Sequence, residues 1–206
     1  CAERVVEVLD TEIDIVNPEN AFVPTEPKGE VEFKNVNFKY DPESHGDNIL
    51  ENISFKAKPG QIVGIVGGTG CGKSSLVNLI PRLYDATQGE VLVDGVNVKK
   101  YDLKALREMI GVVLQKNVLF SGTIEENIRW GKKDATHEEI VAACKAAQAD
   151  SFINEQPDGY NTYLAQGGLN LSGGQKQRLC IARAMIKKPK ILILDDSTSA
   201  VDTTVL

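Results

Sequence analysis

Residues 67–74, Gly67-Gly68-Thr69-Gly70-Cys71-Gly72-Lys73-Ser74, fit the pattern G-x-x-x-x-G-K-[ST] that wraps the phosphates of a nucleoside triphosphate. The four glycines permit backbone conformations that turn N–H groups toward the phosphates and that a Cβ would hinder. We expect the Lys73 ammonium to lie against the β- and γ-phosphates and the Ser74 hydroxyl to bind Mg²⁺.

The segments that flank this loop favour the same interpretation. Residues 61–66 read as a short buried strand, and residues 75–80, beginning with Ser75, have the apolar periodicity of a helix. The phosphates are then expected at a helix N-terminus. An ordinary glycine-rich turn is the alternative, and the Lys-Ser ending and the flanking pattern disfavour it.

Composition sets limits on the rest of the chain. Its 206 residues suffice for one large domain or two small ones, and 42% of them are hydrophobic. With 23 basic and 29 acidic residues the net charge is −6, which disfavours nucleic-acid binding through a general basic surface but leaves a local patch possible. The sequence has neither an apolar run near the ~18 residues of a membrane span nor a signal peptide, so we expect a soluble chain.

Four cysteines, Cys1, Cys71, Cys144 and Cys180, are scattered without a C-x-x-C pair. This spacing favours neither a zinc site nor a disulfide framework, and it predicts reduced thiols, with Cys144 and Cys180 on helical faces. Cys71 is expected to be prone to alkylation because it lies inside the phosphate loop beside Lys73.

Periodicity predicts an alternation of strands and helices along the chain. Residues 30–40 and 48–57 alternate as half-exposed strands, and residues 90–98 read as a hairpin that turns at Asp94-Gly95. Two amphipathic strands before a buried one predict an antiparallel sheet beside a parallel core. The remaining expected elements are a helix over 1–9, an extended linker over 10–29, a helix over 103–109, strands over 110–114 and 190–194, and a helix over 175–186.

Helices are also predicted between residues 123 and 153. Capping boxes at Thr123 and Thr136 mark the starts of two of them. We expect His137 to lie in a solvated first turn rather than to act in catalysis, and Trp130 to serve in packing.

A second motif with a chemical role lies near the C-terminal end of the sequence. The apolar run of residues 191–194 leads directly into Asp195. A carboxylate at the carboxyl end of such a strand is the expected partner of a phosphate loop, where it would hold Mg²⁺ from the side opposite Ser74.

The run Leu171-Ser172-Gly173-Gly174-Gln175 is the most specific signal. Together with residues 67–74 and 191–195, it makes the chain resemble the nucleotide-binding domain of ATP-binding cassette (ABC) proteins, from about residue 30 to the last residue. The resemblance implies an α/β fold: a P-loop NTPase core of the RecA type, a flanking antiparallel β-subdomain and an inserted α-helical subdomain at about 117–186. We expect residues 29–206 to form this domain, without its C-terminal end, and residues 1–28 to be a linker that follows the last transmembrane helix.

The resemblance implies ATP and Mg²⁺ as cofactors and assigns roles to single residues. Tyr40 matches the aromatic residue that stacks on adenine, the alternative being a tyrosine that merely ends a strand. Gln115 matches a glutamine that touches Mg²⁺ and the attacking water, and Asp202 the acidic residue of a loop that crosses to the opposite subunit. The implied catalytic residues are Lys73, Gln115 and Asp196, and the implied metal ligands are Ser74, Gln115 and Asp195. The implied nucleotide contacts are Tyr40, Gly67, Gly68, Thr69, Gly70, Cys71, Gly72, Lys73, Ser74, Ser75, Gln115, Ser172, Gly173, Gly174 and Gln175.

The same resemblance implies partners. The family's domains pair head-to-tail around two ATP molecules, so residues 171–175 are expected to contact the γ-phosphate held by a second nucleotide-binding domain. Ser172 and the glycine amides open a helix, which makes them an anion site. Residues 1–15 and 120–128 are similar to the exporter branch, which implies a transmembrane domain in the same polypeptide, the cytoplasmic face of the cell membrane, and no nucleic-acid partner.

Asp196 departs from the family pattern, which has Glu as general base after the metal-binding aspartate. The aspartate side chain is about 1.5 Å shorter, and a base must come within about 3 Å of the proton that it takes. Such an aspartate is familiar in one half of heterodimeric exporters. It implies a degenerate site that binds ATP and hydrolyses it slowly.

Two further departures concern the surroundings. Residues 165–168, Ala-Gln-Gly-Gly, stand where exporters carry a Gly-Glu-Arg-Gly-like stretch, so Gln166 alters the expected contact with the membrane domain. The family's switch histidine would lie beyond Asp202, and neither His45 nor His137 is positioned to replace it. Weak ATPase activity is therefore expected of this chain alone.

Three functions remain open from the sequence. The first is the ATPase motor of an exporter, and the second is an ATP-binding half that regulates a heterodimer and scarcely hydrolyses ATP. A soluble ABC ATPase of DNA repair or translation is the third, which the acidic balance and the exporter-like N-terminus disfavour. A GTPase or small-molecule kinase would have no need of residues 171–175.

Overall fold

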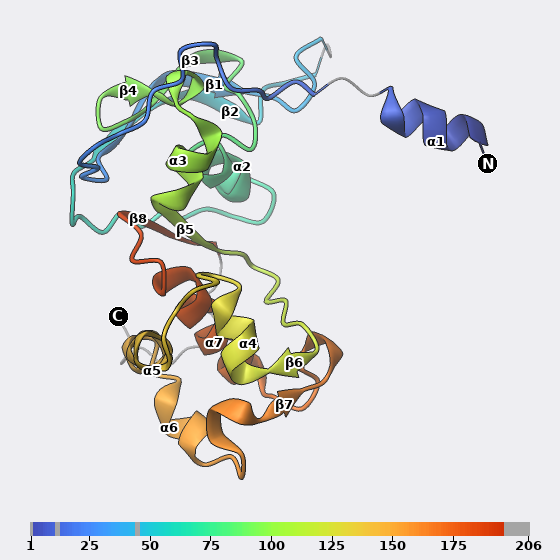
Figure 1. The fold of residues 1–206 in the computed structure, drawn as a ribbon. Coiled ribbons are helices and arrows are strands. Elements are labelled where there is room, and N and C mark those ends of the chain that lie inside the picture. The colour runs from blue at the N-terminus through green and yellow to red at the C-terminus, as the bar shows by residue number, and fades with distance from the viewer. Residues whose placement is uncertain (1, 11–12, 44–45, 196–206) are drawn as a thin grey trace. The chain divides into compact units, whose positions relative to one another are not determined.

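A computed structural model describes residues 2–10, 13–43 and 46–195, and the chain divides into two compact units (Figure 1). The first unit consists of Cys1–Glu26 and Glu30–Leu106, and the second of Pro27–Gly29 and Arg107–Leu206. The predictions for Asp196, for His45 and for the loop at residues 199–202 lie outside the described residues.

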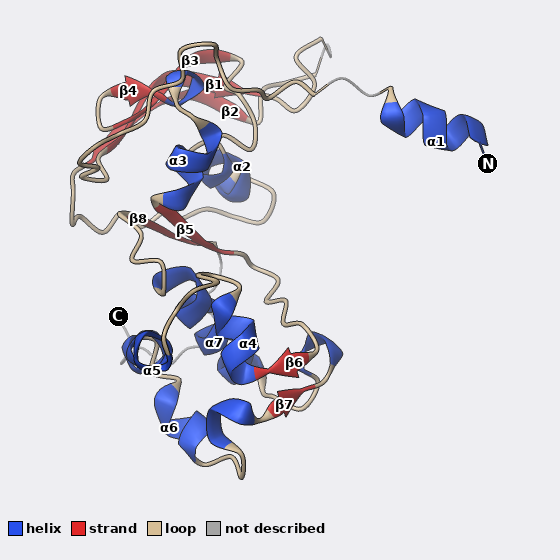
Figure 2. Ribbon diagram, viewed as in Figure 1, coloured by secondary structure: helices blue, strands red, loops and turns tan. Residues whose placement is uncertain are grey.

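An antiparallel sheet organises the first unit. Its strand order is β2-β1-β3-β4, and its members are β1 (Val31–Phe38), β2 (Leu50–Ala57), β3 (Gln88–Val93) and β4 (Val96–Asn97) (Figure 2). Val31 pairs with Ala57 on one side and with Val93 on the other. Val31, Phe33, Val36 and Phe38 are buried, as expected for a strand with one face on the core, and the register shifts between Phe33 and Val36. The predicted antiparallel sheet is confirmed.

The hairpin predicted over residues 90–98 is also confirmed. Asp94 and Gly95 both have positive φ angles, 48° and 77°, which two-residue hairpin turns require. A 3₁₀ turn, η1 (Val98–Lys100), follows β4 directly.

The N-terminal segment contains the predicted helix, α1 (Ala2–Leu9), and residues 13–26 are non-helical chain attached to the first unit. Phe22 forms a parallel bridge with Tyr101, and the two rings meet edge to face at 5.1 Å. The Asn17 side chain donates to Asp102 at 2.7 Å and accepts from the amide of Leu103, the first residue of α3 (Leu103–Glu108). The segment predicted as an extended linker is thus anchored at the start of α3.

The buried strand predicted over residues 61–66 is wrong. None of the described strands includes or pairs with this run, and Ile62 and Val66 are 91% and 98% exposed. Apolar residues favour burial, but a strand forms only where neighbouring strands supply hydrogen-bond partners for its N–H and C=O groups. In the sheet of the first unit β2 and β4 are the edge strands, and neither of them pairs with residues 61–66.

Two short strand pairs belong to the second unit. β5 (Ile110–Val113) and β8 (Ile191–Leu194) are parallel, in register from Ile110 opposite Ile191, and lie side by side in Figure 1. β6 (Gly122–Thr123) and β7 (Tyr163–Leu164) are antiparallel. The predicted strands at 110–114 and 190–194 are confirmed.

Helices enclose the core of the second unit. They are α4 (Ile124–Arg129), α5 (His137–Ala146), α6 (Asp150–Asn154) and α7 (Gly173–Met185), with the 3₁₀ turns η2 (Gly159–Asn161) and η3 (Gln166–Gly168). Ile128, Ile140 and Leu179 are fully buried between them. Both predicted capping boxes are confirmed, because Thr123 and Thr136 each accept a hydrogen bond from the third residue of the helix.

The predictions for the cysteines and for Trp130 can also be compared with the structure. Cys144 and Cys180 are free and buried on helices, as predicted, whereas Cys71 is free and exposed. Trp130 is 68% exposed, so the expectation that it serves in packing is wrong. Among the described residues, each helix is too short or too polar to traverse a lipid bilayer.

Candidate functional site

The phosphate loop leads directly into α2 (Lys73–Asn78). Gly72 caps this helix with φ at +85°, a conformation that glycine adopts without strain. A Cβ at Gly72 would also lie 2.9 Å from the Cδ2 atom of Leu50 on β2. Both the backbone conformation and the packing therefore require glycine at this position.

The Lys73 side chain curls back over the loop that precedes it. Its ammonium group donates hydrogen bonds of 3.0 Å to the carbonyl oxygens of Gly67 and Gly68 and lies 4.0 Å from the sulfur of Cys71. A Cβ at Gly67 would fall 2.5 Å from that sulfur, so the loop closes tightly around the lysine. The Ser74 side chain next to it is exposed. The loop thus holds the Lys73 ammonium against its own backbone carbonyls, while Gly67 and Gly68 remain exposed.

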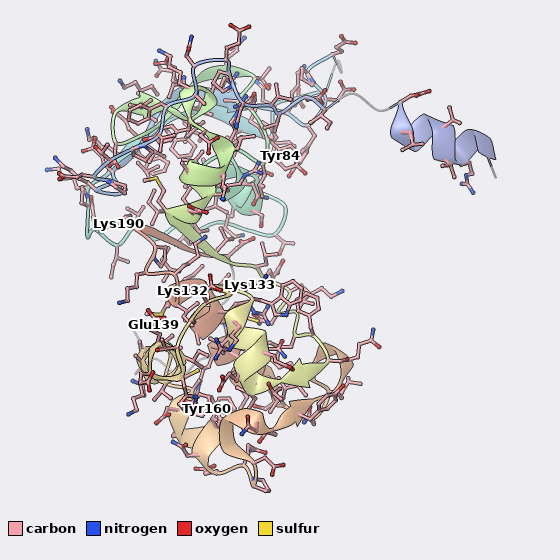
Figure 3. All side chains as sticks on the ribbon, viewed as in Figure 1. Tyr84, Lys132, Lys133, Glu139, Tyr160 and Lys190 are labelled. Atoms are coloured by element: carbon pink, nitrogen blue, oxygen red, sulfur yellow. The ribbon has the colours of Figure 1, made fainter. Side chains whose placement is uncertain are left out.

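Tyr40 lies close to the same helix. Its hydroxyl and that of Ser75, on α2, are 2.9 Å apart, which joins the predicted base-binding residue to the predicted phosphate-binding helix. Its ring meets Phe38 at 5.0 Å and Tyr84 at 4.9 Å, both edge to face. Tyr84, labelled in Figure 3, was missed by sequence reasoning. Its only signal was an aromatic residue shortly after the helix.

Gln115 and Asp195 are brought together in the second unit. β5 and β8 are parallel, so both side chains follow strands that end at the same edge, and the Asp195 amide donates to the Val113 carbonyl at 2.9 Å. In the described part of the chain, no three His, Cys, Asp or Glu residues cluster as a complete metal site. One carboxylate beside an amide oxygen nevertheless suits Mg²⁺, which proteins bind through one or two carboxylates and the phosphates of the substrate.

The signature residues cap the longest helix of the second unit. α7 begins at Gly173, two residues earlier than predicted. The Ser172 hydroxyl accepts from the Gln175 amide at 3.3 Å, and the Ser172 amide donates to the Gln175 side chain at 2.9 Å. The amides of Gly173 and Gly174 have no intrahelical acceptor, as at every helix N-terminus. The structure therefore leaves these two amides without a helical partner and engages the Gln175 side chain in the cap.

Arg183 connects α7 to the segment that follows Gln115. Its guanidinium donates to the carbonyl oxygens of Val118 and Asn127, both at 2.8 Å, and to the Asn127 side chain at 3.0 Å. Burial lowers the pKa of Arg183. The guanidinium also lies 5.7 Å from the centre of the Phe120 ring. Sequence reasoning missed this network, which ties the Gln115 segment to the signature helix.

His137 lies in the first turn of α5 and is exposed, as predicted. Its Nδ1 atom is 2.9 Å from Glu125, which also accepts from Arg129 at 2.7 Å. The pKa of Glu125 is lowered chiefly by the Arg129 hydrogen bond. A second ion pair, Lys132 with Glu139 at 2.6 Å, is labelled in Figure 3. These contacts fix the ends of α4 and α5.

Comparisons with known proteins agree with this geometry. The family model described as "ABC transporter" matches residues 50–199. The chain is 48% identical over 200 residues to "Putative multidrug export ATP-binding/permease protein YgaD" of Bacillus subtilis (strain 168), covering 97% of this chain and 34% of that protein. It is 47% identical over 203 residues to "ABC transporter B family member 3" of Dictyostelium discoideum, covering 98% of this chain and 14% of the relative.

A solved structure is similar throughout. "Structure of a bacterial Atm1-family ABC exporter with ATP bound" superposes with a TM-score of 0.91 at 39% identity, covering 99% of this chain and 35% of that one. The chain thus spans about a third or less of the length of these proteins. Its fold is the predicted P-loop NTPase fold of mixed α/β content with an antiparallel sheet. The chain belongs to the ABC transporter family, as an ATP-binding domain of the exporter type, the class of domain that acts as an ATPase.

Proposed function

We propose that this chain binds ATP with Mg²⁺ and hydrolyses it as the motor of a longer protein that exports a substrate across a membrane. The observation that carries the proposal is the phosphate loop, in which Lys73 lies within 3.0 Å of the Gly67 and Gly68 carbonyls at the start of α2. The similarity to exporters over nearly the whole chain supports the transport role.

In this proposal Lys73 and the loop contact the phosphates of ATP, and Tyr40 contacts the adenine. ATP phosphates would replace the Gly67 and Gly68 carbonyls as partners of Lys73, and hydrogen bonds between ionised groups are stronger than those to neutral carbonyls. The adenine ring would stack on Tyr40, which is 52% exposed and held beside α2. The loop from Gly67 to Ser75 would thereby bind the phosphates.

Ser74, Gln115 and Asp195 would hold Mg²⁺. When bound, the ion supplies positive charge beside the β- and γ-phosphates, where negative charge gathers during phosphoryl transfer. Gln115 would orient the attacking water, and Asp196 would accept its proton. The nearness of Gln115 and Asp195 at one strand edge supports their shared role.

A second nucleotide-binding domain would complete the site. Ser172, Gly173, Gly174 and Gln175 would contact the γ-phosphate of the ATP bound by that domain, in a head-to-tail pair that is either homo- or heterodimeric. The support is the N-terminus of α7, where two glycine amides without intrahelical acceptors follow an intact cap.

A transmembrane domain of the same polypeptide would be the other partner, with the chain at the cytoplasmic face of the cell membrane and no nucleic acid involved. The greater length of the relatives supports this, as does the exposed aromatic pair of Phe120 and Trp130, whose rings are 4.8 Å apart. In this proposal residues 1–28 link that domain to the nucleotide-binding domain at 29–206, whose helical subdomain spans about 117–186.

A second candidate is favoured by Asp196. In that version the chain is the ATP-binding half of a heterodimer, and its own site hydrolyses ATP slowly because the shorter side chain reaches the water less well. Its intact residues 172–175 would then complete the partner's site.

Single-turnover hydrolysis of ATP by the whole protein, with its partner domain present, tests both candidates. If the chain is the motor, the wild type hydrolyses its bound ATP and Asp196→Glu changes the rate little. If it is the regulatory half, the wild type is slow and Asp196→Glu raises the rate. Unchanged ATP binding in Lys73→Ala would contradict both.

A further inference from the structure

We propose that Tyr84 is a positioning residue for the nucleotide base: together with Ser75 it holds the Tyr40 ring in place, so that recognition of the base depends on Tyr84. The inference rests on the proposed function, because it takes Tyr40 as the platform for the base. It concerns residues of the first unit only, all of which the structure describes.

The backbone around Tyr40 is fixed on both sides. The Ile49 amide donates to the Phe38 carbonyl at 2.8 Å, and the Lys39 amide donates to the Thr87 hydroxyl at 3.2 Å. The Thr87 amide in turn donates to the Asn37 carbonyl at 2.9 Å. These bonds place the end of β1 beside the segment that leaves α2, and they bring Tyr84 within reach of Tyr40.

Three aromatic rings then pack pairwise. Tyr40 meets Phe38 and Tyr84 with interplanar angles of 79° in both cases, and Phe38 meets Tyr84 at 5.8 Å. Phe38 is buried, whereas Tyr40 and Tyr84 are 52% and 40% exposed. Edge-to-face contacts of this kind favour one ring orientation over others. The Tyr40 ring is therefore oriented by its neighbours while it keeps open surface on which a planar base could stack.

The hydroxyl of Tyr40 adds a second support. Ser75, 2.9 Å away, is buried and lies on α2 directly after Ser74. Tyr84 follows the end of the same helix by six residues. Both supports of the ring thus belong to the stretch of chain that begins at the phosphate loop. The base platform and the phosphate site are built as one piece, and a ligand that contacts both gains from their fixed spacing.

In this arrangement the base and the phosphates of the ligand depend on different contacts. Loss of Tyr84 frees the Tyr40 ring to rotate. Binding of the base then has to fix the orientation of that ring, and this costs conformational entropy. The phosphate loop keeps its own contacts between Lys73 and the carbonyls of Gly67 and Gly68. A variant of Tyr84 should weaken binding of the base and spare binding of the phosphates.

The test compares ATP with inorganic tripolyphosphate, both with Mg²⁺, by isothermal titration of the protein that carries this chain. The variants are Tyr84→Ala, Tyr84→Leu, which keeps apolar bulk, and Tyr84→Phe, which keeps the ring. Tyr163→Ala is the matched control, since Tyr163 is an exposed tyrosine on β7 of the second unit.

We expect Tyr84→Ala and Tyr84→Leu to bind ATP about threefold to tenfold more weakly, the effect of losing one edge-to-face contact. Their affinity for tripolyphosphate should be unchanged, Tyr84→Phe should behave as the wild type, and Tyr163→Ala should change neither ligand. Equal weakening of both ligands, or unaltered ATP binding in Tyr84→Leu, would overturn the inference. A wild-type protein that binds neither ligand would refute the proposed function and this inference with it.

Discussion

Asn127 is the side chain whose removal tests the internal network of the second unit most sharply. It is buried on α4, where its oxygen accepts from the Phe120 amide at 2.9 Å and from Arg183 at 3.0 Å. Its nitrogen donates to the carbonyl oxygens of Phe120 and Thr123 at 2.9 and 3.0 Å. Asn127→Ala would remove all four bonds and leave the loop before α4 without its main attachment.

The size of the effect follows from these contacts. A buried neutral hydrogen bond contributes about 0.5–1.5 kcal/mol, and one to a charged group about 1.5–3 kcal/mol. The Phe120 backbone and the Arg183 guanidinium are not fully enclosed, so water can replace part of what is lost. Alanine also gains roughly 0.5 kcal/mol over asparagine as a helix former. We expect a net loss of about 2–3 kcal/mol in the free energy of unfolding.

Urea unfolding measures this loss. With an m-value of about 2 kcal/mol/M, the midpoint should fall by about 1–1.5 M. The ring of the single tryptophan, Trp130, is tilted against that of Phe120 at 4.8 Å and reports locally by its fluorescence, while circular dichroism reports on the helices. The control is Asn154→Ala, an exposed asparagine at the end of α6, for which a change below about 0.5 kcal/mol is expected.

Asn127→Asp provides the discriminating variant. It keeps an acceptor for Arg183 but turns the donor nitrogen into an oxygen that faces two carbonyl oxygens. It should destabilise the protein despite its opposite charge to Arg183. If Asn127→Asp were as stable as the wild type, or if Asn127→Ala matched Asn154→Ala, the network would contribute nothing and the reasoning would be refuted.

Three further predictions come from single residues. Maleimide should label exposed Cys71 about tenfold more slowly when ATP is at about ten times its Kd, and equal rates would argue against its place in the site. Gly72→Ala should cost about 1–2 kcal/mol from its left-handed backbone alone and weaken ATP binding; unchanged melting and binding would contradict this. Burial raises the pKa of Cys144 from 9.0 to about 12, above its unfolded value. Stability is therefore full below pH 9 and falls as pH rises toward 12, by up to about 1.4 kcal/mol per unit, a slope that Cys144→Ala should lose in urea titrations between pH 8.5 and 10.5.

Local sequence signals predicted the parts of the fold that depend on local physics. The alternation in residues 30–40 gave β1, because one face of that strand packs on the core while the other meets solvent. Thr123 and Thr136 were identified as helix starts because a capping box satisfies its own backbone amides within four residues. The loop, the signature and the two strand ends were found for the same reason, since their chemistry lies in short runs.

What the sequence could not predict depends on contacts between distant segments. Residues 61–66 have the composition of a buried strand, yet their conformation depends on which strands stand beside them. Tyr84 gave no signal of its own, because its importance comes from Tyr40, which lies 44 residues earlier in the chain. Likewise the Asn127 and Arg183 pair is separated by 56 residues, and neither residue is unusual in a helix. Such pairings become visible only in three dimensions.

Titration of the protein with ATP and Mg²⁺, compared between the wild type and Lys73→Ala, tests the central claim most directly. Lys73 is the cation around which the loop closes, and a charge-assisted bond to phosphate is worth about 1.5–3 kcal/mol. We predict saturable ATP binding by the wild type and binding at least about tenfold weaker in Lys73→Ala. Equal affinity in the two proteins, or no ATP binding by the wild type, would contradict the account.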